Sequence, residues 1–465
     1  MWALLEAMTE TCLEIAERAL AAAPGGGDGF QASVTRERSL LLRFARSRPT
    51  QATSVDDLTV ELTALRDGHL GSATTNSTDD DALTCCARAG AEAAEAAARA
   101  GAGSYPGLPS PAAARAHDGH DRETARLDPA RGGEALRAAF DTAAAEGVEA
   151  HGVWTAGEIE TGIASSTGIA AADRVTDAFM KVVAIASGGR SGYAAATAVA
   201  SAALEPAELG RRAARKAAAG GGEAASAARL DPGEHDVVFE SHAVGELLDW
   251  LGYTAFNGLA HAEGRGALCE RLGERVVAPA VNLSDSPRFT GTLPRAYDAE
   301  GVPKAPLPLI QDGVAHAVVH DTRSAALAGA PGSTGHALAP GGSPYGALPT
   351  NLVLVGGGAA DERELCQDVE RGIYVTRLWY SNAVRPKQTL VTAVTRDGTF
   401  LVENGEITRP LADMRLTDSV LGILSRTQAL GARAALASQG EFYGRRFASG
   451  VVCPPLRAAG VRFTA

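Results

Sequence analysis

A glycine- and alanine-rich stretch, residues 217–234, divides this chain into two parts of similar length. The stretch ends in Asp231-Pro232-Gly233, a run that favours a turn. A chain of 465 residues is also too long for one small hydrophobic core. We therefore predict an N-terminal domain over residues 1–216, a linker over 217–234 and a C-terminal domain over 235–465.

The N-terminal part mixes helical and strand-like patterns, which predicts an α/β domain. Apolar residues recur at helical spacing over residues 1–23. An alanine-rich segment predicts a helix over 79–100, with Asp79 or Asp80 as its N-cap. A Pro/Gly/His loop over 105–126 precedes a third helix over 133–146. Apolar or alternating runs predict strands at Phe30–Thr35, Leu40–Ala45, Val60–Leu65, Gly68–Thr75, from Val153 onward, Asp173–Ala186 and Tyr193–Ala202.

The C-terminal part is richer in strand patterns, and we expect a β-rich α+β domain. Asp397-Gly398 and Asn404-Gly405 are typical of β-hairpin turns. Asp361 followed by Glu364 fits a capping box and predicts a helix before Gly372. A second late helix is expected over Met414–Leu430. The predicted strands are Arg275–Leu283, Leu309–Asp321, Asn351–Val355, Gly372–Tyr380, Gln388–Arg396 and Thr399–Val402.

Composition excludes several classes of protein. A net charge of −12 argues against nucleic acid as a main partner. Six cysteines in so long a chain do not form a disulfide framework. The N-terminal segment lacks the basic residues of a signal peptide, and no apolar run reaches the ~20 residues needed to cross a bilayer. We expect a cytoplasmic protein with no membrane partner. The four lysines among 43 basic residues, with abundant alanine, suggest a GC-rich bacterial genome.

Two histidine pairs are the first candidate metal ligands. His316 and His320 are four residues apart, but the β-branched residues around them predict a strand. In a strand the two histidines would lie ~13 Å apart. His117 and His120 lie in a polar loop with two aspartates, whose composition explains them without a metal. We interpret both pairs as structural or surface residues.

Two further motifs carry little chemistry. The run Gly356-Gly357-Gly358 follows a strand and precedes a helix, but it lacks the GxGxxG spacing and the lysine of a phosphate-binding loop. Cys453 precedes two prolines near the C-terminus, and no histidine-bearing motif points to it as a nucleophile. A tight turn and a buried thiol explain these two features.

The segment after the linker contains the strongest candidate site. Val237–Phe239 predicts a short strand, and Ser241 is a plausible cap for the helix that follows. Val244, Leu247, Leu248 and Leu251 form an apolar stripe on that helix. His242 and Glu246 are four residues apart and share another face, where they can pair with each other or place two ligands on a metal ion.

The chain resembles the TldD/PmbA (TldE) family over nearly its whole length. The strand Arg371–Asn382 is similar to a hallmark segment of that family, and so is Thr395–Ile407 with Met414-Arg415 after it. Leu309–Gly313 with His320-Asp321-Thr322, and Gly189–Tyr193, match further shared blocks. The resemblance implies the TldD/PmbA fold.

The resemblance also implies a two-subunit peptidase. In this family the TldD-type subunit carries an HExxxH zinc motif and a late cysteine ligand, while the TldE-type subunit keeps the fold without the zinc site. Their pairing encloses a cavity that admits small unfolded peptides, such as precursors of peptide antibiotics and antitoxins. Here the three motif positions hold Ser241, His242 and Glu246, and the tail around Cys453 is more similar to the TldE tail.

We therefore expect a non-catalytic, TldE-like subunit of a heterodimeric zinc metallopeptidase. No catalytic residue and no metal ligand is assigned to this chain, and zinc is expected in the TldD-type partner. Ser241, His242 and Glu246 are the candidate cavity-lining residues. Two alternatives stay open: a self-sufficient metal-dependent hydrolase that uses His242, Glu246 and Cys453 in a rearranged site, and a peptide-binding scaffold without a hydrolase partner.

Overall fold

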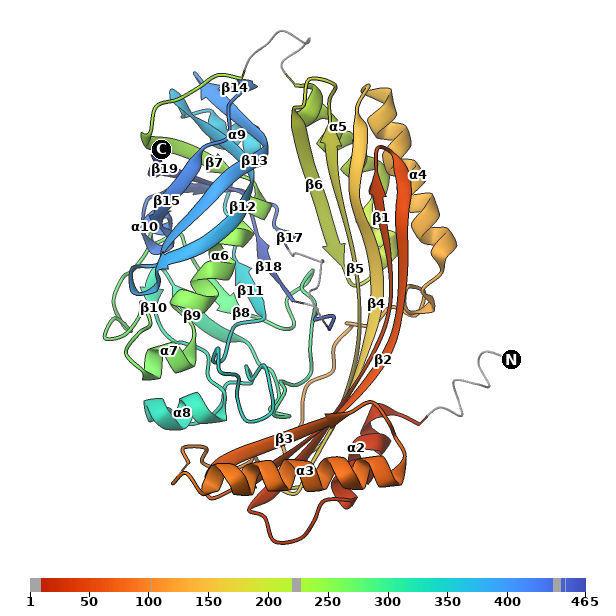
Figure 1. The fold of residues 1–465 in the computed structure, drawn as a ribbon. Helices are drawn as coiled ribbons and strands as arrows, with labels where there is room; N and C mark the ends of the chain where they lie inside the picture. The colour runs from red at the N-terminus through yellow and green to blue at the C-terminus, as the bar shows by residue number, and fades with distance from the viewer. Residues whose placement is uncertain (1–9, 102, 220–226, 438–444, 448) are drawn as a thin grey trace.

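A six-stranded antiparallel sheet runs the length of the molecule (Figure 1). The computed structural model describes residues 10–101, 103–219, 227–437, 445–447 and 449–465. The strand order is β3-β2-β1-β4-β5-β6, and neighbouring strands pair antiparallel throughout. The strands are β1 (Gly29–Ala45), β2 (Arg48–Arg66), β3 (His69–Thr75), β4 (Glu149–Ser165), β5 (Ala170–Ile185) and β6 (Ser191–Ala198).

One strand replaces the two that were predicted at Phe30–Thr35 and Leu40–Ala45. Strand β1 continues through the charged run between them, because β2 and β4 pair with it on both sides. The charges in that run have partners: Arg38 lies 2.6 Å from Glu158 of β4, and Ser39 donates a hydrogen bond to buried Glu37. The prediction was wrong because it treated the polar residues as a turn.

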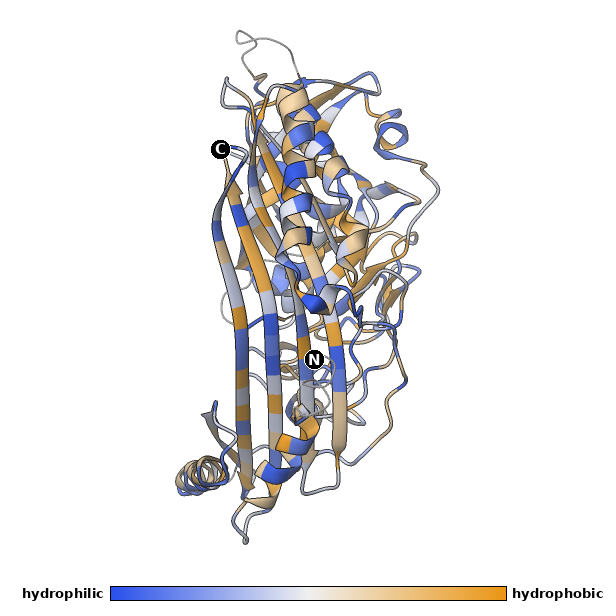
Figure 2. Cartoon of the chain, turned by 90° about the vertical axis from the view of Figure 1, so that its right-hand side faces the viewer, coloured by the Kyte–Doolittle hydropathy of each residue, from blue (hydrophilic) through white to orange (hydrophobic). Residues whose placement is uncertain are grey.

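Four helices cover one face of the long sheet. Helices α2 (Cys12–Ala21) and α3 (Asp80–Ala98) pack near one end, and α4 (Pro129–Ala145) and α5 (Pro206–Ala218) near the other (Figures 1 and 2). Asp79 is the N-cap of α3, as predicted, although its side chain makes no capping hydrogen bond. The helix predicted over 133–146 begins earlier, at Pro129, since Asp128 caps it. Residues 1–9 of the predicted first helix lie outside the described residues.

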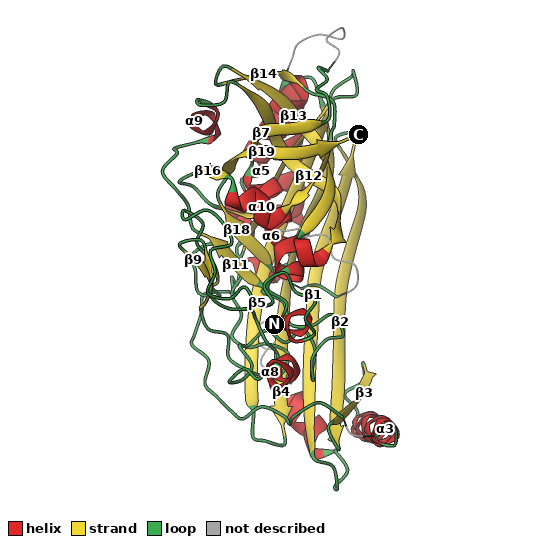
Figure 3. Ribbon diagram, turned by 90° about the vertical axis from the view of Figure 1, so that its left-hand side faces the viewer, coloured by secondary structure: helices red, strands yellow, loops and turns green. Residues whose placement is uncertain are grey.

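The C-terminal part contains two sheets. The first has the order β10-β9-β8-β11-β18-β17. In the second, β12-β7-β19-β15-β13 closes into a ring because β12 also pairs with β13 (Figure 3). The strands are β7 (Gly233–Phe239), β8 (Leu283–Asp285), β9 (Leu307–Gln311), β10 (Val314–Ala315), β11 (Asn351–Leu354), β12 (Arg371–Arg385), β13 (Leu390–Glu403), β14 (Glu406–Pro410), β15 (Arg415–Ser419), β16 (Thr427–Leu430), β17 (Ala435–Ala437), β18 (Gly450–Cys453) and β19 (Leu456–Thr464).

Within the described residues, five helices accompany these sheets. They are α6 (Ser241–Thr254), α7 (Gly258–Ala262), α8 (Thr322–Ala328), α9 (Glu362–Cys366) and α10 (Val420–Ser425). Asp361 caps α9 as predicted, by accepting hydrogen bonds from the backbone of Arg363 and Glu364. Glu364 completes the turn by accepting from the backbone of Ala360 rather than that of Asp361.

Asp397-Gly398 does not form the predicted hairpin turn. Both residues have positive φ, but they form a bulge inside the continuous strand β13, where the register with β12 shifts. Asp397 is buried there and accepts a 2.5 Å hydrogen bond from Ser191 of β6. Asn404-Gly405, by contrast, does turn β13 into β14, as predicted.

Two other predictions in the C-terminal part were wrong. The helix expected over Met414–Leu430 is split into β15, α10 and β16, because the Ser419 hydroxyl caps α10 and ends the strand before it. The strand expected over Arg275–Leu283 is mostly loop, with β8 beginning only at Leu283.

The expected linker, residues 217–234, includes the end of one helix and the start of one strand. Helix α5 continues to Ala218, and β7 begins at Gly233. Residues 220–226 lie outside the described residues. Among the helices that the structure describes, none is long and apolar enough to cross a membrane.

The face of the long sheet opposite α4 and α5 meets the C-terminal part, and Arg446 forms the best-defined contact between them. Its guanidinium makes two 2.7 Å hydrogen bonds to the Asp177 carboxylate of β5 and one of 2.9 Å to Thr155 of β4. Both Arg446 and Asp177 are buried. The side chain lies where a Cβ at position 157 would be 2.5 Å from its Nε, so Gly157 leaves the space that it occupies.

Breaking this pair should destabilise the protein. We expect Arg446→Met to lower the free energy of unfolding by about 3–5 kcal/mol, because it leaves the Asp177 carboxylate buried without a partner. The double variant with Asp177→Leu should recover most of that loss, since no unpaired charge is left. Urea unfolding measures both effects, and a double variant as unstable as Arg446→Met would contradict the explanation.

Candidate functional site

Helix α6 begins directly after the central strand β7, which pairs with β12 on one side and β19 on the other. Its N-cap is Glu240, and Ser241 is the first helical residue. The prediction that Ser241 caps the helix was therefore wrong by one position. Glu240 itself makes no side-chain capping bond, because its carboxylate is occupied elsewhere.

A buried ion pair holds Glu240. Lys216 of α5 lies 2.6 Å from its Oε1, and the hydroxyl of Tyr374 in β12 donates a 2.6 Å hydrogen bond to the same oxygen. Burial alone would raise the pKa of Glu240, but the positive charges of Lys216 and Arg212 keep it below its ordinary value. Lys216 also donates to the Tyr193 carbonyl of β6. The start of α6 is thus bonded to α5 in the N-terminal part of the chain and to β12 in the C-terminal part.

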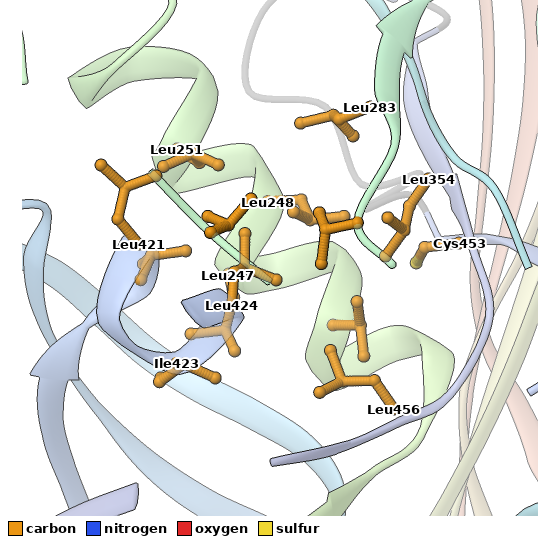
Figure 4. Packing of buried hydrophobic residues seen from close by; sticks show 14 of the residues in the cluster. Leu247, Leu248, Leu251, Leu283, Leu354, Leu421, Ile423, Leu424, Cys453 and Leu456 are labelled. Atoms are coloured by element: carbon orange, nitrogen blue, oxygen red, sulfur yellow. The ribbon is translucent and has the colours of Figure 1, made fainter. Parts of the chain in front are cut away.

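The apolar stripe of α6 lies in the main hydrophobic core, as predicted. Val244, Leu247, Leu248 and Leu251 are each at most 2% exposed. Figure 4 shows Leu247, Leu248 and Leu251 facing leucines and an isoleucine of α10 on one side and strands on the other. Gly245 lets β17 approach closely, since a Cβ at this position would lie 2.4 Å from that of Ala437.

Cys453 is buried at the end of β18, beside the first turn of α6. Its thiol donates a hydrogen bond of 3.2 Å to the carbonyl oxygen of Ser241. Burial raises the thiol pKa well above its usual range, so the sulfur stays protonated at neutral pH. In this state the thiol is a hydrogen-bond donor to the first turn of α6 and is not activated as a nucleophile.

A cleft of about 670 Å³ lies between α6 and the long sheet. His242 and Glu246 line it, whereas Ser241 is buried and is not among the lining residues. Opposite them are Lys181 and Tyr193 of the long sheet. The remaining wall includes Asp249, Trp250 and Tyr253 of α6 and the β12 segment 377–381.

His242 is a neutral residue in this cleft. Its ring packs edge-on against Tyr193, with 5.4 Å between the ring centroids. Burial lowers its pKa to about 4. Its Nε2 is buried and has no hydrogen-bond partner among the described residues.

Glu246 is bonded to strand β12. It accepts a hydrogen bond from Ser381, whose hydroxyl in turn accepts a 2.7 Å bond from the indole nitrogen of Trp250. The register between β12 and β13 shifts between Trp379 and Asn382, and Tyr380 has a φ of 52°. Such a bulge re-aims neighbouring side chains, which explains how Ser381 reaches α6.

These residues do not fit a zinc site. The imidazole of His242, the carboxylate of Glu246 and the thiol of Cys453 each contact a different neighbour. Within the described part of the chain, no group of three or more His, Cys, Asp or Glu side chains is arranged to hold a metal ion. Ser241 contributes a backbone carbonyl to the thiol of Cys453.

The other candidates have structural partners. His117 lies 2.8 Å from Asp173, and His120 lies 2.8 Å from Glu158. His320 is buried beside Ser324, and His316 is exposed. Both follow β10, which ends at Ala315, so the strand predicted through Asp321 was too long. Gly356–Gly358 form an exposed loop.

Most of the residues that line the cleft were not identified from the sequence. Trp250 and Tyr253 were absent from the candidate list, as were Trp379 and Tyr380. Trp379 and Tyr380 lie in the segment Arg371–Asn382, which resembles the family, and this resemblance could have identified them as candidate site residues.

Models of one protein family match almost the whole chain. Their descriptions are PmbA/TldA metallopeptidase domain 1 for residues 31–101, the central domain for 123–220 and the C-terminal domain for 232–465. A metalloprotease of Methanothermobacter thermautotrophicus is 27% identical over 225 residues, which are 48% of this chain and 48% of that protein. The match thus spans about half the length of that relative.

Solved structures share the fold. TldE from Thermococcus kodakarensis has a TM-score of 0.82 at 18% identity, covering 97% of this chain and 99% of that one. A candidate modulator of a DNA gyrase from Thermotoga maritima MSB8 has a TM-score of 0.81 at 21% identity, covering 94% and 96%. From the fold and the three matching models together, the chain belongs to the PmbA/TldD metallopeptidase family.

Proposed function

We propose that this chain is the non-catalytic, TldE-like subunit of a heterodimeric zinc metallopeptidase that processes small unfolded peptides. The observation that carries the proposal is the state of α6. A helix at the place of the family's zinc motif keeps its buried stripe and its close contact with β17, but its ligand positions hold Ser241, His242 and Glu246. A TldD-type partner would supply the zinc and the catalytic base.

The cleft supports a role in holding the peptide. Strand β7 pairs with β12 only as far as Val375, while β13 continues along the other edge to Arg385. The cleft-lining segment 377–381 follows the point where β7 ends. An extended peptide can add to such an edge through backbone hydrogen bonds, which do not depend on its sequence. We infer that the complex acts in the cytoplasm, where unfolded precursor peptides are available.

Metal analysis tests the proposal directly. The purified chain alone should contain no stoichiometric zinc and should hydrolyse no peptide. Addition of a TldD-type chain with an HExxxH motif from the same genome should give a stable complex that contains zinc and cleaves unfolded peptides. One tightly held zinc per isolated chain, measured by atomic emission, would sink the proposal.

Substitution of His242 and Cys453 separates this proposal from a self-sufficient hydrolase. If these side chains only line or support the cleft, His242→Ala and Cys453→Ala should leave the kcat of the complex nearly unchanged. A hydrolase that used them would lose about 100-fold or more, the usual effect of removing a catalytic acid or base. Circular dichroism of each variant controls for misfolding.

The third hypothesis, a peptide-binding scaffold with no hydrolase partner, predicts a different result on purification. Such a chain would purify from its own cells without a TldD-type protein. Affinity purification of the tagged chain at native expression level, followed by mass spectrometry, distinguishes the two.

A further inference from the structure

We propose that the cleft contains a subsite for a cationic group of the bound peptide, formed by the Asp249 carboxylate and the aromatic side chains around it. The ligand chemistry is a primary ammonium or a guanidinium. It comes either from a lysine or arginine side chain or from the amino terminus of the peptide. This inference deepens the proposed function and rests on it in one respect, namely that the cleft holds a peptide.

Asp249 occupies a central place in the cleft. It lies on the same face of α6 as His242 and Glu246, seven and three residues after them. A second cavity of about 240 Å³, lined by Leu348, Pro349 and Phe447 among others, shares Asp249 and Tyr253 with the main cleft. A peptide that extends from one space into the other would pass this carboxylate.

The charge of Asp249 is not balanced by the protein. Among the described residues, no hydrogen bond or ion pair reaches its side chain, and the nearby charge that acts on it is that of Glu246. Neighbouring groups that limit the hydration of the carboxylate, together with this like charge, raise the pKa of Asp249 to about 6, although the residue is exposed to the cleft. Arg377, a cation of the same cleft, is bonded to Asp397.

Several buried carboxylates elsewhere in the chain have cationic partners, whereas others, such as Glu300, accept hydrogen bonds from neutral groups. Glu240 is paired with Lys216, Asp177 with Arg446, and Glu158 with Arg38. Asp249 is exposed to the cleft and has no cationic partner among the described residues, so a cationic ligand in the cleft can form an ion pair that the protein itself does not provide. Asp249 differs from these residues in facing an open cleft, where a ligand can provide the missing charge.

Aromatic rings that line the same cleft as Asp249 add a second attraction for a cation. Tyr253 is 47% exposed, Trp379 is 45% exposed and Tyr380 is 73% exposed, although all three line the cleft. Ring faces attract ammonium and guanidinium groups. The protein already uses this interaction here, because the Arg396 guanidinium lies 4.2 Å from the Trp379 ring centroid.

His242 provides an independent sign that the cleft is made for a polar ligand. Its buried Nε2 has no hydrogen-bond partner among the described residues. A neutral imidazole nitrogen in this position can bond a backbone group of a bound peptide, while Asp249, seven residues along the same face, binds the cation. Both sites then recognise one extended chain.

Peptide binding to the isolated, full-length chain tests the inference without zinc and without a partner. The probes are N-acetylated, amidated five-residue alanine peptides with lysine, arginine, norleucine or glutamate at the centre, studied by calorimetry. We expect the lysine and arginine peptides to bind about tenfold more tightly than the norleucine peptide, the scale of one charge-assisted hydrogen bond. A pentaalanine with a free amino terminus separates a terminal ammonium from a basic side chain.

Variants locate the effect. Asp249→Asn should lower the affinity for the lysine peptide about tenfold, to the level of the norleucine peptide, without changing the latter. Asp81→Asn, which removes an exposed carboxylate on α3 far from the cleft, is the matched control and should change neither affinity. The midpoint of urea unfolding confirms that both variants are folded.

Three experimental outcomes would each contradict the inference. These are equal affinity for the lysine, free-amine and norleucine peptides, an Asp249→Asn variant that binds like the parent, or no binding of any probe. The outcome is separate from that of the proposed function. A chain that fails to activate a TldD-type partner but binds cations through Asp249 would refute only the proposed function, and the opposite result would refute only the subsite.

Discussion

The buried pair between Glu240 and Lys216 is the interaction on which the arrangement of the site depends. Glu240 follows β7, a strand of the C-terminal ring, and is the N-cap of α6, while Lys216 belongs to helix α5 of the N-terminal part. Both groups would be costly to bury alone, and together with Tyr374 they satisfy each other. Because this contact joins α5 to the start of α6, it sets how far α6 lies from the long sheet. The cleft is the space that remains.

The two sides of helix α6 are under different structural constraints. The stripe from Val244 to Leu251 packs in the core, and Gly245 admits β17. These constraints act on the buried side of the helix. The other side faces the cleft, where Tyr193 packs against His242, Ser381 donates a hydrogen bond to Glu246, and Trp250 donates one to Ser381. Substitution on that side alters the surface of the cleft and leaves the packing intact.

Sequence patterns predicted which helices and strands exist better than they predicted where each begins and ends. Periodicity identified α3, α4, the stripe of α6 and the Asn404-Gly405 turn. It divided β1 at a charged run because the ion pair between Arg38 and Glu158 comes from a strand 120 residues away. It also mistook Asp397-Gly398 for a turn, since only Arg377 and Ser191, brought by tertiary structure, explain a buried aspartate in a bulge.

Only the wall of the candidate site that α6 forms could be predicted from the sequence. His242 and Glu246 stood out because they share one helix face, which local spacing makes visible. Tyr193, Lys181 and the β12 aromatic residues come from three different strands, and no local pattern links them. The unbalanced charge of Asp249 is likewise a property of what surrounds it in space. Its neighbours in the sequence predict only an ordinary helical acid.

The long antiparallel strands restrict how this chain can change in evolution. Strand β4 has 17 residues and so extends about 55 Å, with alternate side chains on opposite faces. Its even-numbered Trp154 packs under α4 and α5, and its odd-numbered Val153 packs on the side of Phe179 and Tyr193. One inserted residue would exchange the two faces along the rest of the strand. Relatives should therefore differ in this sheet by substitution, with insertions and deletions confined to its turns. The lengths of these strands are then a more durable mark of common descent than their amino-acid composition.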